Sequence, residues 1–115
     1  MHLALEETNR LASVEIVRKA VGERVGTKPV FLTGDWNARP DSAPLKGMRG
    51  FMSMLSGTDC GTFNAFKPAR KGSGHCIDYI TVDSASAARV KPVRSWVVED
   101  SVTSDHFPVI VTLSW

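Results

Sequence analysis

The chain has 115 residues and a mass of 12.5 kDa, which is enough for one compact domain and too short for two ordinary ones. Its composition, 43% hydrophobic and 23% charged, is typical of a globular protein. No apolar run approaches the ~20 residues of a membrane helix, and two cysteines make no disulfide framework. A net charge of +2 gives no general argument for a nucleic-acid partner. Composition therefore excludes the membrane, collagen-like and disulfide-scaffold classes.

The first residues, Met1 to Glu7, contain no cationic segment leading into an apolar stretch and a small-residue cleavage site. The sequence therefore predicts no secretory signal peptide, and we expect a cytoplasmic location.

Residues 6–25 are predicted to form an amphipathic helix, because apolar residues recur at steps of three and four: Leu11, Val14, Val17, Val21 and Val25. Gly26 is expected to end this helix. Pro29 then precedes the apolar run 30–33, whose lack of polar alternation favours a buried strand. A helix followed by a buried strand indicates an α/β layer arrangement.

Residues 39–76 are predicted to be irregular, apart from a short helix over 43–54, because six of the nine glycines fall between Gly47 and Gly74. Three strand-like runs follow, over 77–82, 93–98 and 109–113. The last two are expected to be antiparallel neighbours. No repeat or linker divides the chain, so we expect residues 1–115 to lie in one domain.

Charge is unevenly distributed along the chain. Residues 39–71 carry a net charge of +4, and residues 72–115 carry −2. The basic side chains Lys67, Arg70 and Lys71 are candidates for attracting an anionic substrate. Ordinary solvated surface is the alternative interpretation of each.

The first chemical motif is Thr33-Gly34-Asp35-Trp36-Asn37-Ala38, at the end of the predicted buried strand. Side chains two apart on extended backbone point the same way, so Asp35 and Asn37 share a face. A carboxylate and a carboxamide there can orient a water, hold a hard cation or bind a phosphoryl oxygen. The alternative is an ordinary turn, because Gly, Asp and Asn favour turns.

The second motif is Ile77-Asp78-Tyr79-Ile80, in which one carboxylate interrupts the start of an otherwise apolar strand. A buried carboxylate needs a partner, and an imidazole is a natural one. The alternative is an Asp exposed at a strand edge.

The third motif, Ser104-Asp105-His106-Phe107-Pro108-Val109, precedes the last strand, and a solvated loop is the alternative interpretation of it. Together the three motifs supply hard oxygen ligands, a titratable imidazole and a neutral donor, which metal-assisted phosphoester hydrolysis requires.

In this order the three motifs resemble those of the endonuclease/exonuclease/phosphatase superfamily, whose members include deoxyribonuclease-I-like nucleases and inositol polyphosphate 5-phosphatases. The segment Gly61-Thr62-Phe63-Asn64-Ala65-Phe66 resembles a loop of bacterial members. His2-Leu3 resembles the end of a strand that precedes a helix containing an arginine, here Arg10.

The resemblance implies an α/β (α+β) fold in which residues 1–115 form the C-terminal portion of the domain. This portion is half of a four-layer α/β sandwich, a mixed, mainly antiparallel sheet with the N-terminal helix packed on one face. The N-terminal half, with its asparagine motif and main metal-binding glutamate, is missing from this sequence. One face of the half-sheet would then be open, so self-association or pairing with a missing N-terminal half is expected.

The resemblance also implies a hydrolase of ester bonds, a divalent-metal-dependent phosphoesterase of the nuclease or phosphatase kind that uses Mg²⁺ or Mn²⁺. Its substrate would be a phosphate ester, which includes nucleic acid. The alternative is a catalytically inactive truncated module that binds phosphate or a protein partner.

The resemblance implies a role for each candidate site residue. Asp35 would align or deprotonate the attacking water, and Asn37 would hold the phosphoryl group. Asp78 would orient His106 against the phosphate oxygens, and His2 would be a second imidazole on the phosphate side. Asp105, with Asp35 and Asn37, would hold the metal, and the substrate would meet Lys67, Arg70 and Lys71.

Overall fold

The computed structural model describes residues 1–59, 61–66, 75–99 and 103–115. Its elements in chain order are α1 (Glu7–Gly22), β1 (Phe31–Asp35), α2 (Ala43–Met48), β2 (Met52–Met54), β3 (Asp78–Asp83), the 3₁₀ turn η2 (Ser84–Ser86), β4 (Lys91–Val97) and β5 (Val109–Ser114). Within the described residues no helix is long and apolar enough to cross a membrane.

The strands form two antiparallel groups. A three-stranded sheet has the order β1-β3-β2, and β4 and β5 form a separate ribbon, which confirms the predicted pairing of the last two strands. In the register between β1 and β3, Asp35 lies opposite Asp78. The sheet itself therefore brings two carboxylates from different motifs to one place.

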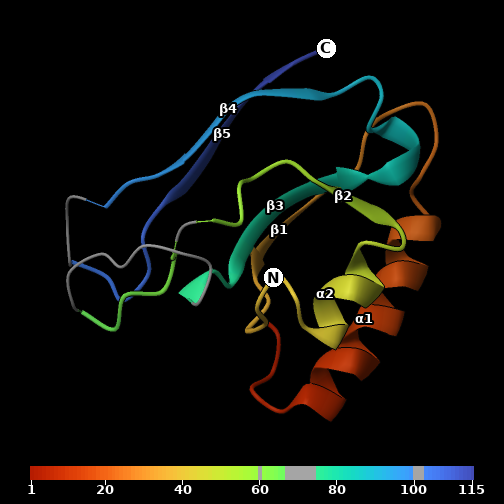
Figure 1. Ribbon diagram of the computed structural model, residues 1–115. Coiled ribbons are helices and arrows are strands. Elements are labelled where there is room, and N and C mark those ends of the chain that lie inside the picture. Colours follow the sequence, from red (N-terminus) through yellow and green to blue (C-terminus); the bar gives the residue numbers. More distant parts are fainter. Residues whose placement is uncertain (60, 67–74, 100–102) are drawn as a thin grey trace.

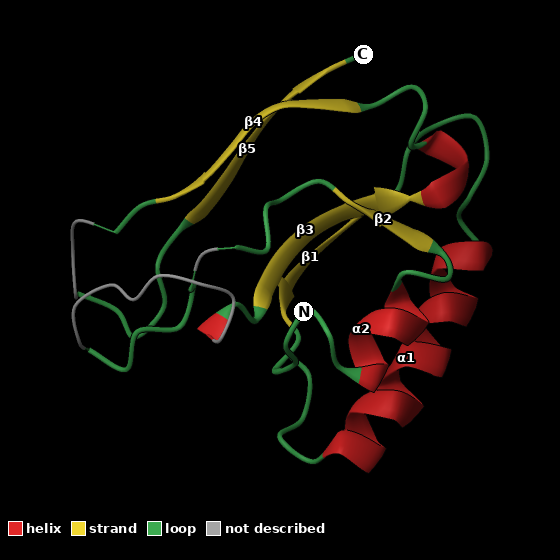
Figure 2. Ribbon diagram, in the orientation of Figure 1, coloured by secondary structure: helices red, strands yellow, loops and turns green. Residues whose placement is uncertain are grey.

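The elements are arranged in layers, with α1 and α2 on one face of the three-stranded sheet and the β4–β5 ribbon on the other (Figure 1, Figure 2). The helix side is filled by a core that includes Val14, Leu45 and Met48, together with Trp36 and Tyr79, whose rings lie 5.0 Å apart. Full burial of such side chains stabilises the fold by about 1.5–3 kcal/mol each.

A second, smaller core lies between the sheet and the ribbon. Leu55, Val82 and Val90 are buried there, and Val111 and Leu113 of β5 pack against them. This arrangement of a mainly antiparallel sheet with a helix on one face confirms the predicted fold class.

The N-terminal residues lie alongside β1 rather than apart from it. His2 forms a parallel bridge with Asp35, and the amide of Leu3 donates to the Asp35 carbonyl over 2.9 Å. Gly34 permits this approach, because its φ of 141° favours glycine and a Cβ there would lie 2.1 Å from the Met1 carbonyl oxygen. The first residues are thus placed beside the Asp35 motif.

Two predicted helices are shorter than expected. The first ends at Gly22 and not at Gly26, and Leu11 and Val25 are each 40% exposed instead of belonging to its buried face. Glycine at the last helical position and Pro29 further on disfavour continuation.

The helix predicted over 43–54 ends at Met48, and Met52–Met54 forms β2 instead. Its residues Met52 and Met54 pair with Asp83 and Thr81 of β3. Sheet hydrogen bonds to a distant strand therefore override the local helical pattern.

Candidate active site

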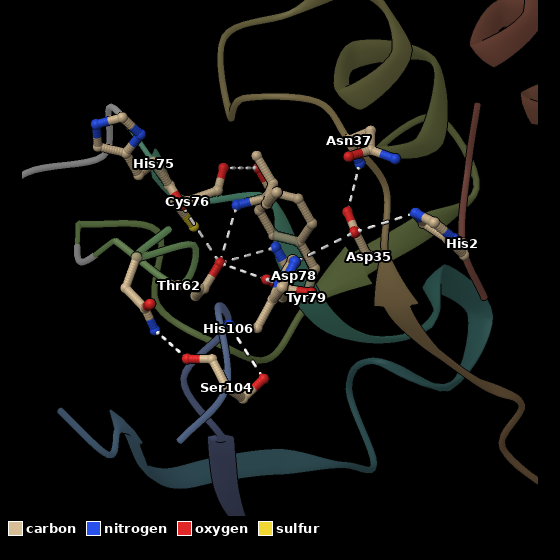
Figure 3. Close-up of polar contacts among 12 residues, drawn as sticks. His2, Asp35, Asn37, Thr62, His75, Cys76, Asp78, Tyr79, Ser104 and His106 are labelled. Atoms are coloured by element: carbon tan, nitrogen blue, oxygen red, sulfur yellow. Dashed lines mark hydrogen bonds and ion pairs between the residues drawn. The ribbon is translucent and has the colours of Figure 1, made fainter. Parts of the chain in front are cut away.

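The site lies where β1 ends and β3 begins. Asp35 and Asp78 are paired on the neighbouring strands β1 and β3, and the segment before β5 brings His106 close to both. His106 Nδ1 lies 2.8 Å from Asp78 Oδ2, and His106 Nε2 lies 3.7 Å from Asp35 Oδ2 (Figure 3). The structure thus brings three residues from three separate motifs into one cluster.

The partners of His106 determine its tautomer and its charge. A carboxylate accepts hydrogen bonds, so Nδ1 carries the proton that is donated to Asp78. Burial alone would lower the pKa of His106, but the Asp78 hydrogen bond and the charges of Asp78, Asp35 and Asp105 outweigh it and raise the pKa above its ordinary value. These contacts therefore stabilise the protonated ring relative to that of a free histidine.

Asp35 is the central carboxylate of the cluster. Its Oδ1 accepts a hydrogen bond from the backbone amide of Asn37 over 2.8 Å, and its Oδ2 lies 3.4 Å from His2 Nε2. Figure 3 shows the Asp35 carboxylate between His2 and His106. The His2 side chain is 75% exposed, so this imidazole reaches the site from the solvent side.

Asn37 lies next to the cluster with its backbone in the left-handed region, at a φ of 46°. Its side-chain nitrogen donates to the Leu3 carbonyl. The side-chain nitrogen of Asn37 therefore binds the N-terminal segment, in addition to the contact of the Asn37 backbone amide with Asp35.

Asp105 approaches His106 closely enough to raise the pKa of that histidine, but it is not a member of the Asp35–Asp78–His106 cluster. Its carbonyl accepts a hydrogen bond from the Asn64 amide over 2.7 Å. The predicted substrate contacts, Lys67, Arg70 and Lys71, lie outside the described residues.

The cluster has the donor chemistry of a cation site. One ligand atom each from Asp35, Asp78 and His106 lies within 4.8 Å of the others. Hard divalent cations prefer carboxylate oxygens, so the residues of this cluster fit such an ion. Asp78 Oδ2 already accepts two hydrogen bonds, so Asp35 is the carboxylate better placed to bind an ion.

Three further residues contact the cluster or the segment just before His106 and were not identified as functional from the sequence. The Thr62 hydroxyl donates to Asp78 Oδ2 over 2.6 Å, and the Phe63 ring meets the His106 ring edge-on at 5.2 Å. Asn64 donates from its side chain to the Ser104 carbonyl over 3.0 Å. All three belong to the Gly61–Phe66 segment. The resemblance of this segment to a family loop was the one sequence feature that pointed to a functional role for them.

A cavity of about 290 Å³ opens beside the cluster, on the face of the sheet opposite the helices. Asp78, Thr33 and Phe107 are among the residues that line it. The site therefore adjoins a space of the size of a small ligand group.

Most of the chain matches one family of known proteins. Residues 10–106 match the model of the endonuclease/exonuclease/phosphatase family, a span that includes Asp35, Asp78 and His106. A search of curated proteins finds no match to this chain.

Solved structures share the fold. A mannosyl-6-phosphatase from Bacteroides thetaiotaomicron VPI-5482 is similar with a TM-score of 0.79 and 26% identity, over 99% of this chain and 49% of that one. An endonuclease/exonuclease/phosphatase family protein from Bacteroides thetaiotaomicron has a TM-score of 0.76 and 27% identity, over 97% and 47%.

A protein of the same description from Bacteroides vulgatus, at 24% identity, is similar in fold, with a TM-score of 0.76 over 98% of this chain and 47% of that one. The chain spans about half the length of these structures, as a partial domain does. On its motifs, its fold and the match over residues 10–106, the chain belongs to the endonuclease/exonuclease/phosphatase family.

Proposed function

We propose that the Asp35–Asp78–His106 cluster belongs to a divalent-metal-dependent phosphoesterase. The observation that carries the proposal is the position of His106, whose two ring nitrogens face two different carboxylates. One carboxylate orients the ring and the other lies at its reactive nitrogen, which is an arrangement suited to general acid–base work. Membership of the family supports this class of chemistry.

In the proposed mechanism Asp78 holds the Nδ1 proton of His106, so Nε2 points toward the space beside Asp35. The protonated imidazole donates from Nε2 to a phosphate oxygen and neutralises part of its negative charge. Asp35 accepts a proton from the attacking water, or aligns that water, as the water oxygen bonds to phosphorus. The ester P–O bond breaks, the leaving oxygen takes a proton from solvent, and His2 offers a second donor to the phosphate.

The same proposal includes the cation. Asp35 of the cluster would hold Mg²⁺, and the resemblance to the family adds Asp105 and the side-chain oxygen of Asn37 as further ligands. When bound, the ion would supply Lewis-acid polarisation of the phosphoryl oxygen. Few carboxylates are available for this in the described residues, so we expect weak affinity for the ion.

A phosphate ester is the proposed substrate class. The similar mannosyl-6-phosphatase supports a phosphomonoester of a sugar as one member of that class. The second candidate function, a module that binds phosphate without turnover, is favoured by one observation, namely that the chain spans about half of its solved relatives.

A hydrolysis assay with Mg²⁺ tests the proposal. The probes are p-nitrophenyl phosphate, bis(p-nitrophenyl) phosphate and mannose 6-phosphate, each with and without a chelator. We expect the chelator, Asp35→Asn and His106→Gln each to reduce turnover, the two substitutions by about 100-fold or more. Asp41→Asn and His75→Gln serve as matched controls, because neither side chain belongs to the cluster.

The outcomes separate the two functions. Turnover that is unchanged in both Asp35→Asn and His106→Gln contradicts the proposed active site. Phosphate binding that is lost in His106→Gln, in a chain that shows no turnover with any probe, supports the binding module instead.

A further inference from the structure

We propose that Thr62 is a positioning residue, which fixes the Asp78 carboxylate and through it the imidazole of His106; this inference rests on the proposed function. Thr62 is separated from Asp78 by 16 residues and from His106 by a longer stretch of chain, yet it contacts both segments. Figure 3 shows its hydroxyl oxygen as the meeting point of several hydrogen bonds.

Every hydrogen-bonding position of the Thr62 hydroxyl is occupied. Its one proton is donated to Asp78 Oδ2 over 2.6 Å, because the other acceptor in reach, the His75 carbonyl, is 3.4 Å away. Its two lone pairs accept from the amides of Ile77 and Asp78, each over 3.1 Å. A hydroxyl has one donor and two acceptor positions, so all three are satisfied and its direction is fixed.

The backbone of Thr62 joins the same two segments. Its amide donates to the His75 carbonyl over 3.0 Å, and its carbonyl accepts from the Phe107 amide over 2.7 Å. Thr62 is 1% exposed, so water does not replace these bonds. The residue therefore holds the start of β3 and the segment of His106 at a set separation.

Asp78 Oδ2 receives two hydrogen bonds, one from Thr62 and one from His106 Nδ1 over 2.8 Å. Without the Thr62 donor, the carboxylate keeps only the His106 hydrogen bond on Oδ2, so its orientation is less tightly fixed. The imidazole then loses a fixed acceptor. A misplaced orienting group of this kind typically costs 10–100-fold in activity or ligand affinity.

A buried threonine also stabilises a fold, so the test needs a matched control. Thr81 provides it, because it is also 1% exposed and its hydroxyl donates over 2.8 Å, in this case to the Leu32 carbonyl on the helix side of the sheet. Thr62→Val and Thr81→Val each remove one buried hydroxyl, and only Thr62→Val removes a bond to the cluster.

The experiment is proton and nitrogen NMR of the histidine rings in the folded chain, which contains three histidines. The His106 signal is assigned by its loss in His106→Gln. We expect a Nδ1–H resonance bonded to Asp78 in the wild type, in Thr81→Val and in Thr62→Ser, which keeps the hydroxyl. In Thr62→Val we expect this resonance to be displaced or absent.

Turnover, where the assay above detects it, is measured on the same variants. We expect kcat to fall about 10-fold or more in Thr62→Val, with little change in KM, and to recover in Thr62→Ser. An unchanged His106 resonance in folded Thr62→Val overturns the proposal. If Thr62→Val does not fold, loss of the resonance in Thr62→Ser overturns it. Because the NMR reads the contact without turnover, failure of the phosphoesterase function is distinguishable from failure of the Thr62 role.

Discussion

Gly34 makes the tightest backbone approach beside the site. Any Cβ there would lie 2.1 Å from the Met1 carbonyl oxygen and 2.4 Å from the Met1 nitrogen, and the φ of 141° is itself strained for other residues. Gly34→Ala should therefore displace the N-terminal segment, carry His2 away from Asp35 and lower the free energy of unfolding by on the order of 3 kcal/mol.

Denaturant unfolding measures this change, and Gly22→Ala is its control. A Cβ at Gly22 meets nothing within 4 Å at the end of α1, so this variant should be unchanged or more stable by up to about 1 kcal/mol. Equal stability of Gly34→Ala and the wild type would show that the N-terminal residues do not lie where the structure places them.

Side chains of the site differ in how readily a sequence shows them. Asp35, Asp78 and His106 were identifiable because ionisable groups at the ends of apolar strands are conspicuous. Thr62 was not, because a threonine beside glycine and asparagine is also what an ordinary loop contains. Its importance depends on Asp78, a partner 16 residues away that only the folded chain brings near.

At the level of elements, Asp83 joins the end of β3 to two neighbours. Its carboxylate accepts from the Val30 amide over 2.8 Å, just before β1, and from the Ser86 amide over 3.0 Å, in η2. Burial alone would raise the pKa of Asp83, but these hydrogen bonds and the nearby Arg89 outweigh it and hold the pKa below its ordinary value.

A group with a lowered pKa stabilises the folded state above its unfolded pKa, here 3.8, and this contribution is lost as the pH falls through the folded value. Asp83→Asn should therefore cost about 1–3 kcal/mol at pH 7, and its difference from the wild type should narrow below about pH 4. Denaturant unfolding between pH 2.5 and 7 measures the stability cost at pH 7 and the narrowing of the difference at low pH. A constant difference over this range would contradict the assignment, and the exposed Asp41→Asn is the control.

The strands were more predictable than the helices. β3, β4 and β5 follow apolar runs closely, since a half-buried strand needs only a few such residues. The segment 49–54 was wrongly predicted as helix, because the pairing of Met52 and Met54 with β3 depends on residues some 30 positions away. Local patterns carry no information on that contact.

On the scale of the whole molecule, apolar side chains remain exposed at the β1 edge of the three-stranded sheet. Phe31 of β1 is 39% exposed and Trp115 is 82% exposed, with their rings 6.4 Å apart. Phe31 lies opposite Val82, whose side chain faces the β4–β5 ribbon. Exposed patches of this kind favour association.

We expect the chain to self-associate through this face as its concentration rises, as sedimentation velocity would measure. Phe31→Lys should shift the equilibrium toward monomer, because it places a charge in the contact. Ile16→Lys, at a 70% exposed position on α1, should leave it unchanged. A wild-type chain that stays monomeric throughout the accessible concentration range would rule out this association.

The central claim, that one phosphate-ester site is centred on His106, is tested most directly by titrating inorganic phosphate with Mg²⁺ into the isotope-labelled chain and following its NMR signals. The claim predicts saturable shifts concentrated at Asp35, Asp78 and His106, which are lost in His106→Gln. A separate cavity of about 620 Å³, lined in part by Arg89 and Trp115, offers the competing location. Shifts confined to that cavity, or none at the Asp35–Asp78–His106 cluster, would contradict the claim.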